Sequence, residues 1–164
     1  MFREMRRKKQ MLSMEETASL LTEGTAGVLA LTGDDGYPYA VPLSYVYDGS
    51  KIWFHCAKSG HKLDAVRRNP RASFCVIGQD QIVPEEYTTY FKSVIVFGQI
   101  RVLEEEEEKR EAIERLAVRY TPEDTPASRA EVIGRSWASL CVLEMSIDHM
   151  SGKQAVELVK PDKK

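Results

Sequence analysis

The order of the β-favouring segments constrains the fold of this chain more than any other feature of its sequence. Turn residues separate six such segments, which cover residues 26–32, 37–47, 51–56, 71–78, 89–103 and 137–147. They do not alternate regularly with helices, as the strands of a doubly wound parallel sheet do. The order therefore predicts a mainly β (α+β) fold, a six-stranded antiparallel barrel with peripheral helices.

Two of these segments carry signals about their place in the sheet. Pro38 and Pro42 lie in the second segment, and proline cannot donate a backbone hydrogen bond to a neighbouring strand. We therefore expect this strand at an edge of the sheet or at a bulge, where a ligand or partner can approach. The segment 89–103 is apolar at both alternating sets of positions, which predicts a central strand buried on both faces.

Helix signals fall between the strands. Ser13 and Glu16 form a capping-box pattern, so an amphipathic helix is expected to run from there to about Glu23. The acidic run 104–108 suits the positive end of a helix dipole and predicts a further helix. Shorter helical segments are expected over 61–68 and 127–134.

The size and charge of the chain limit its class. With 164 residues, 43 % of them hydrophobic, it is expected to form one domain, 1–164, which includes a basic arm over 1–12 and a C-terminal tail over 149–164. A formal net charge of -2 gives no strong field to attract nucleic acid or an anionic membrane. No stretch approaches the roughly 20 apolar residues of a membrane span. The cysteines Cys56, Cys75 and Cys141 are widely spaced in apolar runs and are interpreted as reduced, so we expect a soluble cytoplasmic protein.

Several chemistries lack their motif. His55, Cys56 and His61 are close in the sequence, but the other cysteines lack the paired spacing that closes a zinc shell, so no metal site is expected. The sequence also contains no nucleophile elbow, P-loop or Rossmann glycine fingerprint. Enzyme classes built on those motifs are excluded.

The turn after the third segment is the strongest candidate for a binding site. Its residues are small, hydroxylated and cationic, and they lead into a helix: Lys58, Ser59, Gly60, His61 and Lys62. A helix N-terminus supplies free backbone N–H groups and a partial positive charge, which stabilise a phosphate. The turn is equally consistent with a phosphate cradle and with a capped surface turn that carries solvated lysines.

Three further features have an ordinary structural interpretation beside a functional one. A lone histidine in a strand, such as His55, is more commonly a packing residue, but the cationic turn that follows favours a functional role. Trp137 is more commonly part of a core or interface than a stacking partner for a planar cofactor. The basic arm could contact an acidic partner, and we favour a clasp between subunits.

A family resemblance adds to this interpretation. The runs Gly-Tyr-Pro-Tyr at 36–39, Val-Pro-Leu-Ser-Tyr at 41–45 and Ser-Val-Ile-Val-Phe-Gly at 93–98, with the basic arm and Phe54-His55, are similar to the Nim-type (5-nitroimidazole resistance) branch of the pyridoxamine 5'-phosphate oxidase-like flavoproteins. The similarity extends in order over nearly the whole chain. It implies an FMN-binding split β-barrel whose homodimer forms two equivalent sites at the subunit interface.

The resemblance also implies roles for individual residues. His55 is the expected catalytic residue, near the flavin and the substrate. The segment 43–45 is expected to line the edge of the flavin ring, and the positions around the turn to hold the phosphate. Ser93 and Val94 are expected to approach from the second subunit. The full set of expected cofactor-binding residues is Leu43, Ser44, Tyr45, His55, Ala57, Ser59, His61, Lys62, Ser93, Val94 and Trp137.

Three functions follow from this resemblance. The first is an FMN-dependent oxidoreductase that reduces a small planar acceptor, such as a 5-nitroimidazole, at the homodimer interface. The second is a flavin- or haem-binding carrier or sensor that turns nothing over. The third is oxidation of pyridoxamine phosphate, which ranks low because residues 151–164 lack an arginine-rich ending. The wider family includes haem-binding and deazaflavin-binding members, so the fold alone does not fix the cofactor.

Overall fold

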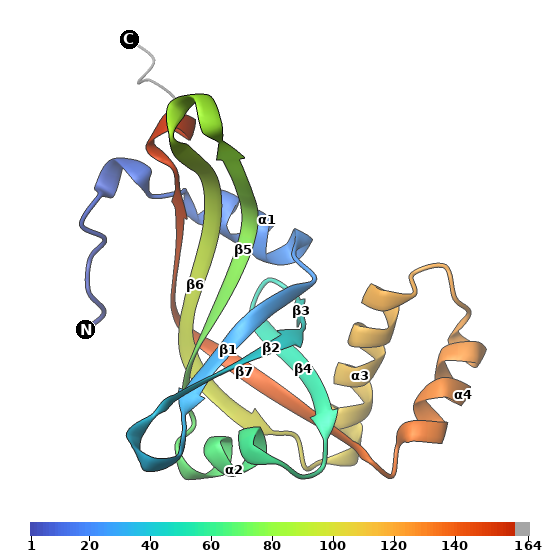
Figure 1. The fold of residues 1–164 in the computed structure, drawn as a ribbon. Coiled ribbons are helices and arrows are strands. Elements are labelled where there is room, and N and C mark those ends of the chain that lie inside the picture. Colours follow the sequence, from blue (N-terminus) through green and yellow to red (C-terminus); the bar gives the residue numbers. More distant parts are fainter. Residues whose placement is uncertain (160–164) are drawn as a thin grey trace.

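The computed structural model describes residues 1–159, within which the chain forms seven strands and four α-helices (Figure 1). The strands are β1 (Ala26–Thr32), β2 (Pro38–Ser44), β3 (Val46–Tyr47), β4 (Lys51–Ala57), β5 (Arg71–Val83), β6 (Thr88–Val102) and β7 (Leu140–Gln154). The α-helices are α1 (Met14–Glu23), α2 (His61–Arg68), α3 (Glu106–Tyr120) and α4 (Pro126–Ser136).

All seven strands belong to one antiparallel sheet in the order β2-β1-β5-β6-β7-β4-β3. β2 and β3 are its two edges, although only Tyr45 separates them in the chain. The sheet must therefore curl until its edges meet, which makes a barrel. Within residues 1–159 no ladder joins β2 to β3 or β4, so the barrel is split along this seam. The expected antiparallel split barrel is confirmed, as is the edge position of the proline-containing strand.

The sheet has seven strands rather than the six expected, because Tyr45 turns a corner inside the segment 37–47. The Tyr45 ring is fully buried, and its hydroxyl donates a 2.5 Å hydrogen bond to the Leu21 carbonyl. That carbonyl lies in the last turn of α1, where carbonyls have no partner within the helix. Tyr45 thereby fixes the point at which the chain passes from one edge of the sheet to the other.

The main hydrophobic core fills the inside of the barrel. Phe74 lies at its centre, and the rings of Tyr45 and Phe54 meet it edge-on at 4.9 and 5.0 Å between centroids. On β7, Leu143 and Met145 are fully buried in this core. A second, smaller core joins α3 and α4 to the other face of β4 and β7, and it contains Trp53, Leu116, Ile133 and Val142.

The two N-terminal helices match their sequence signals. Ser13 and Glu16 form the expected capping box: the Ser13 backbone N–H donates to the Glu16 carboxylate at 2.9 Å, and the Glu16 N–H donates to the Ser13 hydroxyl at 3.1 Å. α2 covers the expected residues 61–68. It begins directly after the turn that follows β4 and therefore places its N-terminus beside the end of that strand.

The prediction of two-faced burial for β6 is wrong for the single chain. Val94 and Val96 are fully buried, whereas Ile95 and Phe97 remain 42 % and 39 % exposed. The inner set packs into the barrel core, and the outer set lies on a sheet face that keeps large apolar side chains in contact with solvent.

Two strands are longer than their sequence signals. The polar segment 79–87, expected as a loop, extends β5 and β6 into a long hairpin that pairs up to Val83 and Thr88. β7 begins at Leu140 rather than at Trp137 and continues to Gln154, so residues 149–154 of the expected tail belong to the sheet. Residues 160–164 of that tail lie outside the described part of the chain. The basic arm joins the sheet at its root, where Met11 forms a β-bridge with Lys153.

Candidate functional site

The end of β4 and the start of α2 form the turn that the sequence singled out. Gly60 is the N-cap residue of α2 and has φ +128°, a backbone conformation that residues other than glycine rarely adopt. A Cβ atom at Gly60 would meet no heavy atom within 4 Å, so the space in front of the helix is open. The glycine both permits the sharp entry into α2 and leaves its first turn accessible.

The electrostatics of this turn favour an anion. No side chain caps α2, and the first N–H groups of a helix have no partner within it. Lys58 is exposed and Lys62 half-buried, and none of the ion pairs within residues 1–159 involves either of them. Ala57 and Ser59 are exposed beside them. The turn therefore offers two unpaired cations and free backbone donors at one place, as a phosphate requires.

His55 lies close to this turn, on the face of β4 opposite the barrel core. Its ring meets the Tyr120 ring of α3 edge-on, 6.0 Å between centroids. Partial burial, and secondly the charge of Lys62, lower the pKa of His55 below its usual value of 6.5. The imidazole is therefore neutral at pH 7 and carries one N–H donor and one acceptor nitrogen.

His61 is engaged by the β1–β2 turn. Its ring stacks on Tyr39 at 4.1 Å between centroids, and its Nε2 lies 3.4 Å from the Asp34 carboxylate. Arg68, at the other end of α2, pairs with the same carboxylate at 2.8 Å. The side chain of His61 thus holds α2 against β2, and its backbone N–H belongs to the first turn of the helix, where N–H groups have no partner within the helix.

The expected flavin-edge segment 43–45 divides into inward and outward side chains. Leu43 is half-buried against the barrel core, and the Tyr45 side chain is fully buried. Ser44 is exposed at the seam. Because β2 is an edge strand, its outer backbone groups are also free of a neighbouring strand. Ser44 and the backbone are therefore the parts of this segment that a ligand can reach.

Ser93 and Val94 point to opposite faces of β6. Val94 is fully buried in the core of its own chain, so its side chain cannot reach a second subunit. Ser93 is half-exposed and lines a cavity of about 580 Å³ between the N-terminal arm and the outer face of β6 and β7. We call this space, lined also by Phe2, Arg3, His149 and Lys153, the arm cavity.

Trp137 lies beside a lysine that the sequence did not single out. Lys109 is only 8 % exposed, donates a 3.3 Å hydrogen bond to the Trp137 carbonyl, and places its Nζ 4.1 Å from the centre of the indole ring. Burial, and secondly the charge of Lys58, lower the pKa of Lys109. Helical spacing could have identified Lys109 as a buried residue, because it lies four and seven residues before the buried Ile113 and Leu116.

The thiol nearest the turn is unreactive. Burial and the adjacent Cys141, its register partner on β7, raise the pKa of Cys56 to about 12. The thiol therefore stays protonated at neutral pH and does not serve as a nucleophile. In the described residues, no group of three or more His, Cys, Asp or Glu side chains is arranged to hold a metal ion. None of the helices described is long and apolar enough to cross a membrane.

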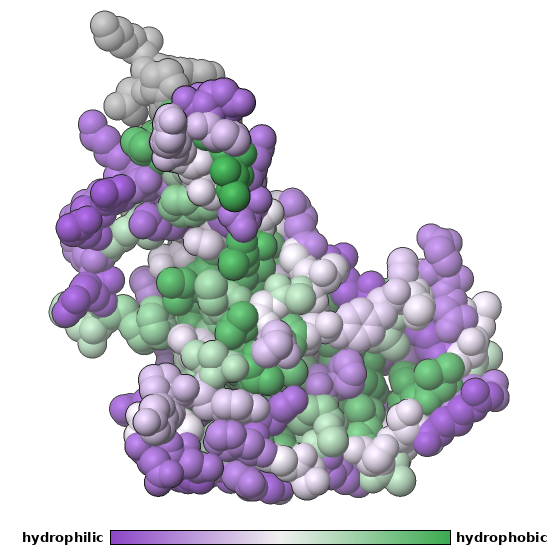
Figure 2. Space-filling view, viewed as in Figure 1, coloured by the Kyte–Doolittle hydropathy of each residue, from purple (hydrophilic) through white to green (hydrophobic). Residues whose placement is uncertain are grey.

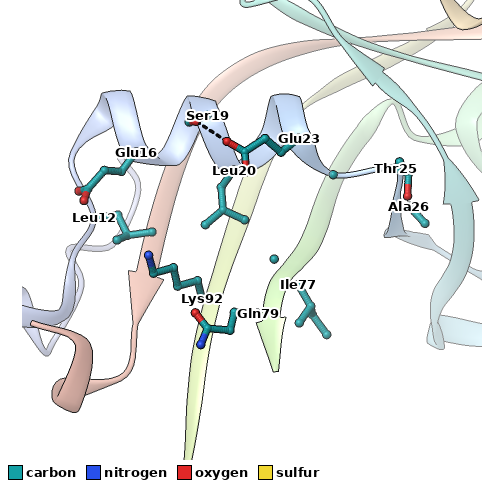
Figure 3. A pocket seen from close by; sticks show the side chains of 12 residues that line it. Leu12, Glu16, Ser19, Leu20, Glu23, Thr25, Ala26, Ile77, Gln79 and Lys92 are labelled. Carbon is teal, nitrogen blue, oxygen red and sulfur yellow. Dashed lines mark hydrogen bonds between the residues drawn. The ribbon is translucent and has the colours of Figure 1, made fainter. Parts of the chain in front are cut away.

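A second cavity, of about 720 Å³, lies between α1 and the strands β5 and β6 (Figure 3). It contains none of the residues expected from the sequence at a cofactor site. Its two carboxylates already have partners: Glu16 belongs to the capping box, and Glu23 accepts a 2.8 Å hydrogen bond from Ser19. We therefore place the candidate site at the turn and the seam.

The chain matches known proteins over most of its length. A sequence profile of the pyridoxamine 5'-phosphate oxidase family matches residues 13–154. A candidate 5-nitroimidazole antibiotic resistance protein of Bacteroides thetaiotaomicron is 22 % identical with a TM-score of 0.74, covering 88 % of this chain and 86 % of that one. An FAD-binding protein of Mesorhizobium loti is 27 % identical with a TM-score of 0.65, covering 88 % and 96 %. An FAD and haem binding protein of Mycobacterium smegmatis is 21 % identical with a TM-score of 0.71, covering 93 % and 76 %.

No curated protein sequence matches the chain. Because the profile spans well over half of the sequence, the chain belongs to the pyridoxamine 5'-phosphate oxidase family.

Proposed function

We propose that this protein is a flavin-dependent oxidoreductase that reduces a small planar acceptor, such as a 5-nitroimidazole. The observation that carries the proposal is the open, cationic entrance of α2 beside the split seam of the barrel. Membership of a family named for an oxidase, and 27 % identity to an FAD-binding protein, support a flavin as the ligand of this entrance.

The residues present fit a flavin. The backbone of α2, with Ser59 and Lys62, would hold its phosphate, because free helix N–H groups and an unpaired ammonium group converge there. Ser44 and the free edge of β2 would meet the polar rim of the ring. FMN is the form that we propose, in line with the family resemblance of the sequence, and its single phosphate group would occupy this turn.

The flavin would supply the redox chemistry, and the chain would supply position and a hydrogen-bond donor. His55 lies beside the turn and is neutral at pH 7, since its pKa is lowered. A neutral imidazole can direct its N–H at an acceptor oxygen on which negative charge develops, and this stabilises the charge without prior proton transfer. His55 is therefore the proposed catalytic residue.

We also propose that the protein acts as a homodimer with two such sites. Pro42, Val28 and Cys75 occupy directly paired positions on β2, β1 and β5, and they form an apolar row across this part of the sheet. Val28, in the middle of this row, is 38 % exposed. Figure 2 shows hydrophobic residues gathered over the middle of this face. A second copy of the chain would bury the row, and Ser93 would then approach the flavin bound to its partner.

The proposal is tested on the purified full-length protein loaded with FMN or FAD. Yellow flavin absorption that remains after desalting is expected, and chromatography of the released cofactor distinguishes FMN from FAD. Lys62→Gln should weaken flavin affinity roughly tenfold through loss of a charge-assisted hydrogen bond. Arg67→Gln, near the opposite end of α2, is the matched control and should leave affinity unchanged.

Turnover is tested by mixing the reduced, flavin-loaded protein with a 5-nitroimidazole without oxygen. Reoxidation faster than that of free flavin at the same concentration is expected, and His55→Gln should slow it. No reoxidation beyond the free-flavin control contradicts the proposed reductase. Failure of the protein to retain either flavin contradicts the proposed site itself.

A second candidate is a flavin or haem carrier that performs no turnover. It is favoured by the protonated state of the Cys56 thiol beside the turn and by the fold shared with an FAD and haem binding protein. A Soret band after incubation with haemin, together with no nitroimidazole-dependent reoxidation, would select this function. Oxidation of pyridoxamine phosphate is the third candidate, and formation of pyridoxal phosphate by the FMN-loaded protein would select it.

A further inference from the structure

The arm cavity is a separate space with an apolar floor and an aromatic lid. Its floor includes Ile95 on β6 and Met150 on β7. Its lid is Phe2, whose ring stacks on His149 at 4.9 Å and an interplanar angle of 11°, and on Phe97 at 5.4 Å and 27°. Its volume of about 580 Å³ is in the range of sites that take small molecules.

The root of the arm is fixed, whereas its tip is held by ring stacking. Leu12 donates a 3.0 Å backbone hydrogen bond to the Gly152 carbonyl, next to the bridge between Met11 and Lys153. A Cβ at Gly152 would lie 2.9 Å from the Leu12 Cβ, so the root packs closely on β7. Phe2 is 43 % exposed. The lid can therefore move away to admit a ligand while the floor and the root remain in place.

The charges that line the cavity are unbalanced. Arg3 and Lys153 both border it, and within residues 1–159 neither forms an ion pair. The other lining charges, Lys8 and Glu4, neutralise each other at 2.7 Å. Two cations thus remain beside an apolar, aromatic space, and an apolar anion is the ligand that complements it.

We propose that the arm cavity binds a planar aromatic carboxylate. The aromatic ring of the ligand lies between Phe2 and the apolar floor of the cavity, and the carboxylate of the ligand meets Arg3 and Lys153. The further claim that this ligand is the acceptor of the redox reaction rests on the proposed function, because Ser93 on the cavity wall is the residue expected to reach the partner's flavin. The binding claim stands independently of it.

The test is calorimetric titration of the full-length protein, with and without bound flavin, using two nitroaromatic probes of similar size. 4-Nitrobenzoate carries the carboxylate and 4-nitrobenzyl alcohol does not. The carboxylate is expected to bind at least about tenfold more tightly, and Arg3→Gln and Lys153→Gln should each weaken its binding roughly five- to tenfold, in line with the loss of a charge-assisted contact. Both variants should leave the alcohol unaffected. Phe2→Ala should weaken both probes, and Lys9→Gln, on the arm but outside the cavity lining, should weaken neither.

Two results would overturn the proposal: equal affinity for the two probes, or carboxylate binding that is indifferent to Arg3→Gln and Lys153→Gln in variants whose circular dichroism matches the parent protein. The outcome is separable from that of the reductase proposal. If 4-nitrobenzoate binds in a charge-dependent way but neither it nor a nitroimidazole reoxidises the reduced flavin, turnover is refuted and the binding site is kept. Reoxidation by a nitroimidazole with charge-independent binding keeps turnover and refutes the site.

Discussion

Individual residues near the turn are tuned by burial and by one neighbouring charge. For His55, partial burial is the larger cause of the lowered pKa, and Lys62 is the smaller. In proton NMR titration its midpoint is expected below 6.5, and Lys62→Gln should raise it without restoring 6.5. The pKa of His55 is lower in the folded protein than in the unfolded chain, so the unfolded chain binds the proton more readily. The free energy of unfolding therefore falls as the pH drops below about 6.5. His55→Gln should remove this part of the acid sensitivity. A midpoint at or above 6.5, or no response to Lys62→Gln, contradicts the assignment.

At the same scale, Tyr45 links α1 to the corner of the barrel. Its hydroxyl is the partner that the structure gives to the Leu21 carbonyl, and burial raises its pKa to about 12. Tyr45→Phe leaves that carbonyl unpaired in the core, and the free energy of unfolding in urea is expected to fall by about 1–2 kcal/mol. Tyr47→Phe on the neighbouring strand, for whose hydroxyl the structure gives no hydrogen bond within residues 1–159, is the matched control. An equal loss in both variants would mean that the Leu21 bond is not the cause.

At the scale of the elements, close approach between strands decides which glycines can be replaced. Gly98 lies at the register shift of β6 against β7, and a Cβ there would lie 1.8 Å from the Ser146 carbonyl oxygen. Gly98→Ala should therefore cost about 2–3 kcal/mol of unfolding free energy. Gly134 in α4 has open space around its Cβ position, so Gly134→Ala should raise stability by up to about 1 kcal/mol. Thermal and urea unfolding of the two variants measure the contrast, and a loss at both positions would contradict it.

At the scale of the whole molecule, the apolar row across β2, β1 and β5 predicts the oligomeric state. Light scattering during size-exclusion chromatography should give the mass of a dimer. Val28→Glu, in the middle of the row, should shift the protein to monomer and weaken flavin retention, because a buried unpaired charge is costly at an interface. Val132→Glu on α4, 56 % exposed and away from the row, should do neither. A monomeric parent protein, or a Val28→Glu variant that stays dimeric, refutes this interface.

The sequence by itself determined the local elements and their polarity. Capping and helical spacing predicted α1, the span of α2 was expected from the sequence, and two prolines predicted an edge strand. The tertiary structure decided what depends on contacts between distant residues. It divided the segment 37–47 at Tyr45, left one face of β6 open, bound His61 to Asp34, buried Lys109 against Trp137 and enclosed the arm cavity. The physical reason is range: hydrophobic period and capping act over a few residues, whereas the closure of a barrel and the covering of a face depend on chain segments that meet only when the whole sheet has curled.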